Sequence, residues 1–170
     1  MIATAAAEPP QRPCDHGHMR GLIHVAIVVT LTGACSATEG DVVDPGARVR
    51  FSNTEASLTV RIADSAEEQR QGLMGVGSLG EDRGMAFVYD DPTTGSFWMK
   101  DTLIPLSIAF VDGDRIVAIE EMKPCETDPC PTWDSDGAAY TVAIEANAGW
   151  FTAHGIAVGD RATLERIGDA

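Results

Sequence analysis

The chain contains 170 residues, with 12 Lys and Arg against 26 Asp and Glu, which gives a formal net charge of −14. This length fits one globular domain of about 100–200 residues, and the 44% apolar composition argues against a disordered chain. Proteins that bind nucleic acid need clustered cations to neutralise phosphates, whereas this sequence has two lysines, Lys100 and Lys123, and no basic run. We therefore expect no nucleic acid as a partner and no electrostatic attachment to an anionic membrane.

Residues 19–35 have the layout of an export signal. Arg20 precedes an apolar stretch, residues 22–31, which is followed by small residues and Cys35. A positive start, about 7–15 apolar residues and a small-residue cleavage site are the parts of a secretory signal. The ending Leu-Thr-Gly-Ala-Cys resembles a bacterial lipobox, which implies cleavage before Cys35 and attachment of lipid to its sulfur. The alternative interpretation is a plain buried hydrophobic segment.

The sequence thus divides into a signal region (residues 1–34), a lipidated Cys35 with a flexible tether (residues 35–47) and one globular domain (residues 48–170). Residues 1–18 fit no part of a signal, so we interpret Met19 as the true start. Residues 1–34 contain two basic and two acidic side chains, so the whole net charge lies in the remainder. We therefore expect a lipid, rather than charge, to anchor the protein to the outer face of a bacterial membrane, in the cell envelope.

Short β-prone runs follow one another along the domain. Residues 58–62 alternate apolar and polar side chains, which is the period-2 pattern of a half-buried strand. Asp112-Gly113 between two apolar runs is the strongest short-range signal of a hairpin. Eight strands are expected, over residues 49–51, 58–62, 85–89, 96–99, 106–111, 115–122, 140–145 and 162–167.

Two short helices are expected to interrupt the strands. Asp64 is placed to cap a helix over residues 65–74, and Glu67 three residues later completes a capping box. Gly75 and Gly77 are expected to end this helix, because glycine tolerates the backbone conformation found after a helix C-terminus.

Asn147 is placed to cap a second helix, over residues 148–154, with Gly155 directly after its end. Helices that do not alternate with the strands argue against a parallel α/β fold. The expected fold class is α+β, mainly β: a compact barrel-like sheet of about eight short strands with two short helices.

Cys125 and Cys130 are the cysteines that remain after the lipobox cysteine. A close, even pair in an exported protein predicts a structural disulfide, which here holds a proline-rich loop. A redox pair is one alternative, although redox motifs usually have two residues between their cysteines and this pair has four. Half of a metal site is another alternative, although a tetrahedral metal needs two further ligands.

Residues 96–106 form the most distinctive segment of the chain. If the segment begins as a strand, the two neighbours of Trp98 point into a core, while Trp98 and Lys100 point the other way. Trp98, Lys100 and Thr102 then form a stacking and hydrogen-bonding surface for a small polar ligand. The alternative is that the aromatic side chains are ordinary core. Arg70, at the end of the first helix, either binds an anion or complements the helix dipole.

His154 is the only histidine after the signal region, so a site with several histidine ligands within one copy is excluded. We interpret His154 as a surface residue or helix-dipole partner and Asp160 as a turn residue. The acidic residues show no calcium-loop spacing, and no nucleophile elbow or Gly-rich phosphate loop occurs. We expect no metal and no cofactor.

Seven short segments carry a family resemblance through their residues and through their order along the chain: residues 70–74, 84–87, 97–106, 124–131, 148–149, 155–156 and 159–160. Together they resemble the family known as domain of unknown function 192, over residues 58–167. The resemblance implies a small, single β-rich domain that is often exported and has no established activity, so it supplies no catalytic residues. Val76 stands where the family commonly has Arg, and Ser107 where it has Asp. We hypothesise that these two family residues pair, and that both were lost together.

The favoured interpretation is a non-catalytic, lipid-anchored envelope module that binds a small ligand, a glycan or a protein. It rests on the export signal, the single remaining histidine and the missing combination of a nucleophile with a base. One alternative is a hydrolase of envelope polymers that uses Lys100, Asp101 and nearby carboxylates. A second alternative is a thiol redox partner that uses Cys125 and Cys130.

Overall fold

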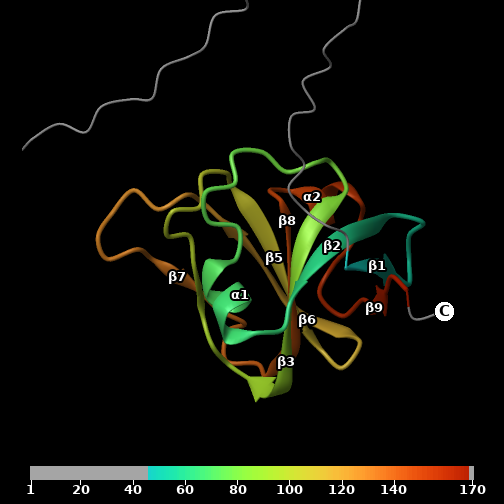
Figure 1. The fold of residues 1–170 in the computed structure, drawn as a ribbon. Coiled ribbons are helices and arrows are strands. Elements are labelled where there is room, and N and C mark those ends of the chain that lie inside the picture. The colour runs from blue at the N-terminus through green and yellow to red at the C-terminus, as the bar shows by residue number, and fades with distance from the viewer. Residues whose placement is uncertain (1–45, 169–170) are drawn as a thin grey trace, which may run out of the picture. The chain divides into compact units, whose positions relative to one another are not determined.

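A curled seven-stranded sheet forms the body of residues 46–168, the part of the chain that this computed structural model describes (Figure 1). Its strands are β1 (Ala47–Phe51), β2 (Ser57–Ala63), β3 (Arg83–Thr93), β5 (Leu106–Asp112), β6 (Arg115–Met122), β8 (Tyr140–Asn147) and β9 (Ala162–Arg166). They lie in the order β6-β5-β8-β3-β2-β1-β9. β2 and β3 run parallel, and all other neighbours run antiparallel. A separate ladder joins β4 (Phe97–Trp98) to β7 (Thr132–Trp133), and the helices are α1 (Ala66–Gln71) and α2 (Trp150–Ala153).

The two edges of the sheet approach each other, so the sheet curls into a half-barrel. Arg115 at the start of β6 forms an isolated antiparallel bridge with Arg161, just before β9. The amide of Ile116 donates a hydrogen bond to the carbonyl of Asp160 at 2.9 Å. The expected mainly β, barrel-like fold class is confirmed. Every expected strand is present, and the two-residue strand β7 is the one that the sequence pattern did not predict.

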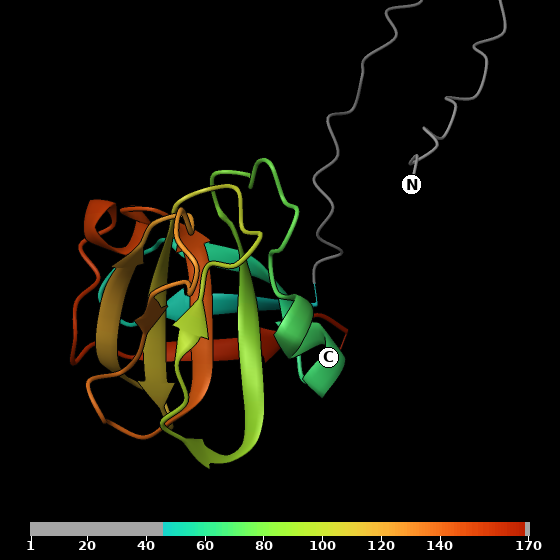
Figure 2. The ribbon, with the colours of Figure 1, turned by 90° about the vertical axis from the view of Figure 1, so that its left-hand side faces the viewer.

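The two faces of the sheet carry separate apolar clusters, because successive side chains of a strand point to opposite faces. On β5, Ala109 and Val111 belong to a cluster that includes Phe151 of α2; we call this side the α2 face. Ile108 and Phe110 belong to the other cluster, on the side that we call the loop face. Figure 2 looks onto the loop face, which α1, the β4–β7 ladder and the connecting loops cover.

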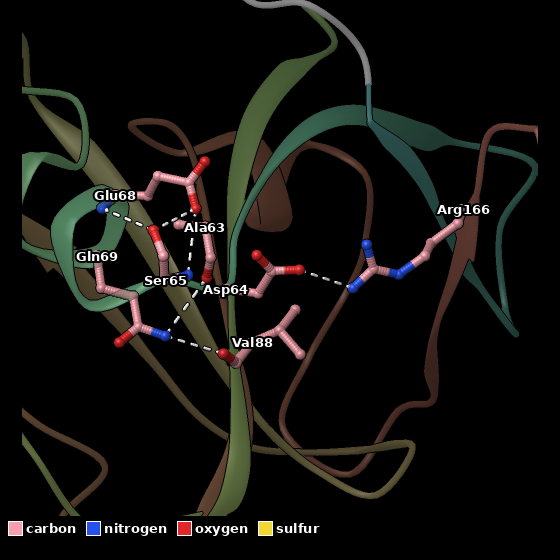
Figure 3. A network of polar contacts seen from close by, with 7 residues as sticks. All are labelled: Ala63, Asp64, Ser65, Glu68, Gln69, Val88 and Arg166. Atoms are coloured by element: carbon pink, nitrogen blue, oxygen red, sulfur yellow. Dashed lines mark hydrogen bonds and ion pairs between the residues drawn. The ribbon is translucent and has the colours of Figure 1, made fainter.

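Helix α1 begins one residue later than the sequence pattern predicts (Figure 3). Ser65 is its N-cap: the Ser65 hydroxyl accepts a hydrogen bond from the amide of Glu68, and the Glu68 carboxylate accepts one from the amide of Ser65. The predicted capping box of Asp64 and Glu67 is therefore wrong by one position. Asp64 instead forms an ion pair with Arg166 at 3.0 Å, which takes its carboxylate away from the helix.

Helix α1 ends at Gly72, whose φ of +48° departs from the helix, rather than at the predicted Gly75. The helix buries none of its residues. Its link to the sheet is polar, because the side-chain amide of Gln69 donates hydrogen bonds to the carbonyls of Val88 at 2.9 Å and Ala63 at 3.4 Å (Figure 3). The helix is thus held by polar contacts of Gln69 with β2 and β3 and by Leu73, which directly follows it and is buried in the cluster of the loop face.

Helix α2 is shorter than predicted, and Asn147 does not cap it. The N-cap is Gly149, which makes no side-chain hydrogen bond. Asn147 is the last residue of β8, and its side-chain amide donates to the carbonyls of Leu79 at 3.2 Å and Gly80 at 2.9 Å. These bonds tie the segment after α1 to the sheet. Gly155 follows the helix with a φ of +68°, as predicted.

The predicted signal region and the lipidation site Cys35 lie outside the described residues. Ala47, which the sequence pattern assigned to the tether, is the first residue of β1. Neither helix within residues 46–168 has the length and apolar character needed to cross a membrane.

Candidate functional site

Strand β4 presents its side chains in alternation. The ring of Phe97 packs edge-on against Phe87 and Phe110, with centroid distances of 4.9 and 5.8 Å. Met99 is also buried, at 1% exposure, whereas Trp98 between them is 47% exposed. The backbone on either side of Trp98 is thus fixed by the core of the loop face, while the indole ring itself faces outward.

The turn after β4 places two more of the predicted residues. The ammonium nitrogen of Lys100 lies 5.4 Å from the centroid of the Trp98 ring, within the range of a cation–π contact. Asp101 adopts a positive φ of +54°, and its carbonyl accepts a hydrogen bond from the amide of Gly75 at 2.8 Å. Thr102 is 7% exposed, and its hydroxyl donates to the carbonyl of Lys100 at 3.4 Å. The bond between Gly75 and Asp101 joins the two segments that cover the loop face.

Trp98 stands between two surface hollows. The larger, of about 540 Å³, lies between Trp98, Lys100 and Asp101 on one side and the loop of residues 125–130 on the other. The smaller, of about 230 Å³, is lined by Arg70, Gln71, Met74, Trp98, Lys100 and Asp101. The fold therefore brings Arg70, Trp98 and Lys100, three of the four predicted ligand-binding residues, to one surface.

The far wall of the larger hollow is the disulfide loop. Cys125 and Cys130 are bonded, with their Cα atoms 5.5 Å apart, so the predicted disulfide is confirmed. The loop between them lines the hollow with the exposed side chains of Glu126 and Asp128. Carboxylates on this wall therefore face Lys100 across the hollow.

A third hollow, of about 30 Å³, lies between α1 and the loop face of the sheet. Residues 69–74, at the end of α1 and in the turn after it, form one wall. The other wall consists of three aromatic rings and two polar side chains: Phe87, Phe97, Trp98, Thr102 and Glu145. The fourth predicted residue, Thr102, thus meets Arg70 and Trp98 here. A hollow of this size accommodates one water molecule or one group of similar size.

Glu145 is the residue of this narrow hollow that the sequence pattern did not reveal. It lies on β8 between Met85 of β3 and Ile108 of β5, and it is 4% exposed. Its carboxyl forms no hydrogen bond or ion pair with any residue of the range 46–168, and burial raises its pKa to about 8. One signal existed in the sequence: an acidic residue at a strand position whose neighbour on the same face, Ala143, is buried in the core.

The hypothesis that positions 76 and 107 form a pair in the family is wrong for this fold. Ser107 alternates with Ile108 and therefore lies on the α2 face, where its hydroxyl donates to Glu121 at 2.6 Å and accepts from the amide of Gly149 at 2.7 Å. Val76 packs against the cluster of the loop face. The sheet separates the two positions, and the sequence alone could not show which face each of them takes.

His154 and Asp160 have structural partners, in line with their predicted roles. The Nδ1 atom of His154 lies 2.8 Å from the carbonyl oxygen of Trp150, and the centroids of the imidazole and indole rings of these two residues lie 4.2 Å apart. The Asp160 carboxylate accepts hydrogen bonds from the side chain of Asn53 and the amide of Ala157, which fixes the turn before β9. Within residues 46–168 no group of three or more His, Cys, Asp or Glu side chains is placed to hold a metal ion.

Comparison with known proteins assigns the domain to a family. The sequence profile of DUF192, described as an uncharacterised ACR, matches residues 47–164. The chain belongs to this family. The matched region contains every residue that lines the three hollows around Trp98. No match is found among curated proteins.

Two crystal structures are similar to this DUF192 domain. One, from Sinorhizobium meliloti 1021, is described as a candidate transcription regulator; it is 30% identical, with a TM-score of 0.64 over 74% of this chain and 98% of that chain. The other is a protein of unknown function from Novosphingobium aromaticivorans DSM 12444. It is 29% identical, with a TM-score of 0.62 over 68% of this chain and 83% of that chain. Neither description names a ligand or a reaction.

Proposed function

We propose that this DUF192 domain is a non-catalytic binding module of the cell envelope that holds a small polar ligand, such as a glycan, against the exposed face of Trp98. The observation that carries the proposal is the setting of this ring. Trp98 is 47% exposed, while Phe97 packs against the core and Met99 is buried. An aromatic ring that its neighbours hold in place provides a large contact area at a low cost in conformational entropy.

Polar groups of both signs surround the ring. Arg70 and Lys100 supply positive charge on one side of Trp98, and Glu126 and Asp128 supply negative charge across the larger hollow. A few convergent polar groups beside an apolar surface are what orients a small ligand in a pocket. A ligand with several hydroxyls, or with charges of both signs, finds partners on this surface.

The cellular setting is part of the same proposal. A lipid on Cys35 anchors the domain to the outer face of a bacterial membrane, which supplies the attachment that a chain with a net charge of −14 cannot obtain from anionic lipids. The full-length chain expressed in a bacterium should enter the membrane fraction, and the Cys35→Ala variant should not. Equal membrane association of both chains would contradict the anchor.

The hydrolase alternative has less support from the arrangement of carboxylates. Hydrolysis of a glycan by two carboxylates requires an acid and a partner about 5–10 Å apart. The carboxylates of the larger hollow, Asp101, Glu126 and Asp128, are all exposed, whereas a general acid needs a carboxyl that its surroundings keep protonated. Among the described residues that line the narrow hollow, Glu145 is the only carboxylate. Asp101 and Lys100, on which the alternative relied, line the outer hollows instead.

A thermal-shift screen tests the binding module. The full-length chain is heated with a panel of monosaccharides, oligosaccharides, amino sugars and amino acids, together with the Trp98→Ala variant. Leu103→Ala is the matched control, because Leu103 is a 62% exposed apolar residue of the same loop that lines none of the three hollows. At least one compound should raise the Tm of the wild type and the control but not of Trp98→Ala. A screen without any shift, or equal shifts in Trp98→Ala, would refute the proposal.

A further inference from the structure

We infer that the narrow hollow beside Glu145 is a subsite for the ammonium group of a primary amine. The inference rests on the proposed function, because Trp98 lines this hollow as well as both outer ones. It specifies the class of ligand: an amine whose cationic head enters the hollow, while the rest of the molecule lies against the Trp98 surface.

The first support is the unpartnered carboxyl at the sheet end of the hollow. Glu145 is 4% exposed and has no hydrogen-bond or ion-pair partner among residues 46–168. A lone carboxylate is strongly disfavoured in an apolar site, so such a group stays protonated until a cation pairs with it. An ammonium group brings the missing positive charge together with three hydrogen-bond donors.

The second support is a second acceptor in the same hollow. The Thr102 hydroxyl donates its proton to the carbonyl of Lys100, which leaves the lone pairs of its oxygen free to accept. Thr102 is 7% exposed and lines the hollow together with Glu145. A donor-only group such as an ammonium therefore meets a hydroxyl as well as a carboxylate.

The third support is the aromatic wall. Phe87, Phe97 and Trp98 all line the hollow, and the first two rings pack edge to face at 4.9 Å. Aromatic rings attract cations through their negatively polarised faces, and the rings of Phe87 and Phe97 have no donor for an anion. Rings combined with a carboxylate favour a cation in this hollow and disfavour an anion.

The volume of the narrow hollow and the cationic side chains around it limit which amines fit. About 30 Å³ admits one small head group, which suits a primary ammonium better than a planar guanidinium or a quaternary ammonium. Arg70 lies at the same hollow and Lys100 beside the outer ones. These cations complement an anionic or hydroxyl-bearing remainder of the ligand, as in an amino acid or an amino sugar, and they disfavour a diamine.

The experiment compares three probes of equal chain length, n-butylammonium chloride, n-butanol and sodium butyrate, titrated into the full-length chain and followed by two-dimensional NMR. We expect n-butylammonium to bind at least about 10-fold more tightly than either other probe, and to perturb the amides of residues 145 and 102. The Glu145→Gln variant, which keeps the size of the side chain, should bind n-butylammonium at least about 10-fold more weakly.

Two further variants complete the test. Glu55→Gln removes an exposed carboxylate from the loop between β1 and β2, outside the narrow hollow, and should bind n-butylammonium as the wild type does. Thr102→Val should weaken binding even if Glu145→Gln does not fold. Equal binding by Glu145→Gln or Thr102→Val, tighter binding of n-butanol, or no binding of n-butylammonium at its highest soluble concentration would overturn the subsite.

The two proposals fail in different ways. If n-butylammonium does not bind while a screened compound still shifts the wild type through Trp98, the ammonium subsite is refuted and the binding module stands. If no compound acts through Trp98, the binding module is refuted as well.

Discussion

Two buried polar side chains, one on each face of the sheet, show how differently the two faces are built. Ser107 on the α2 face is fully buried and fully partnered, since its hydroxyl bonds to both the Glu121 carboxylate and the amide of Gly149. Glu145 on the loop face is nearly as buried, yet its carboxyl has no partner within residues 46–168. The buried hydroxyl of Ser107 has its partners inside the protein, whereas the buried carboxyl of Glu145 leaves a strong acceptor unused.

The helices that cover the two faces also differ in how much of their own surface they bury. Helix α2 closes its face with the buried rings of Trp150 and Phe151. Helix α1 buries none of its residues and is held by the side-chain hydrogen bonds of Gln69. Leu73, directly after α1, is buried in the cluster of the loop face, but the hollows around Trp98 lie between the elements that cover this face. The loop face is therefore the side on which a ligand can enter.

The largest effect is expected on the α2 face. Phe151→Ala should lower the free energy of unfolding by about 3–5 kcal/mol, because a fully buried aromatic side chain leaves a cavity. Denaturant unfolding measures the change, and it should be independent of pH. A loss below about 1 kcal/mol would mean that the α2 face is not the rigid core of the fold.

The second prediction concerns Glu145 of the loop face, which should make the free energy of unfolding depend on pH. Burial holds the pKa of Glu145 at about 8, against 4.5 for an ordinary Glu, so between these values the folded chain binds a proton that the unfolded chain has released. The free energy of unfolding of the wild type should therefore fall, relative to Glu145→Gln, by about 1.4 kcal/mol per pH unit as the pH rises through this window. Over the three pH units from pH 5 to pH 8 the fall amounts to about 4 kcal/mol, and the difference should level off above pH 8.

Denaturant unfolding of both chains from pH 5 to pH 9 makes this measurement, with Glu55→Gln as the exposed control. A difference between the wild type and Glu145→Gln that stays constant across this range would show that Glu145 has an ordinary pKa. The contrast between the two faces would then not hold.

Ser107→Ala should have a smaller effect without pH dependence between pH 6 and pH 9. The variant loses the hydroxyl bonds, but the amide of Gly149 keeps a second acceptor in Glu121 at 3.1 Å. We expect a loss of about 1–2 kcal/mol in the free energy of unfolding, measured by the same denaturant titration. A loss as large as that of Phe151→Ala would mean that this polar contact, rather than apolar packing, dominates the α2 face.

The smallest effect on stability belongs to the residue that we expect to matter most for binding. Trp98→Ala removes a ring that is about half exposed and whose cation–π contact with Lys100 is at the surface, so its cost should be about 1 kcal/mol or less. Thermal unfolding without ligand measures this cost. A loss above about 3 kcal/mol would identify Trp98 as a core residue and weaken its role as a ligand platform.

Much of the fold was predictable because its signals are local. Short β-prone runs, with period-2 alternation in residues 58–62, located the strands, and Asp112-Gly113 located the hairpin between β5 and β6. The errors arose where a side chain has a distant partner. Asp64 pairs with Arg166 and Asn147 reaches Leu79 and Gly80, so neither caps a helix. Such partners come together only after the sheet has formed.

The candidate site was predictable only in its outer part. Residues 98, 100 and 102 were found because they are close in sequence and alternate along one strand and its turn. Glu145 was missed because its character depends on burial between β3 and β5 and beneath α1, elements far apart in the chain. The sequence shows an acidic residue in a strand, but only the fold shows that its carboxyl is buried without a partner.

The most direct test of the central claim is an NMR titration of the side-chain carboxyl carbon of Glu145 in the full-length chain. We expect a midpoint near pH 8 without ligand, and a lower midpoint in the presence of n-butylammonium, because the ammonium stabilises the carboxylate. A midpoint near the ordinary value of 4.5, or one that n-butylammonium leaves unchanged, would contradict this claim.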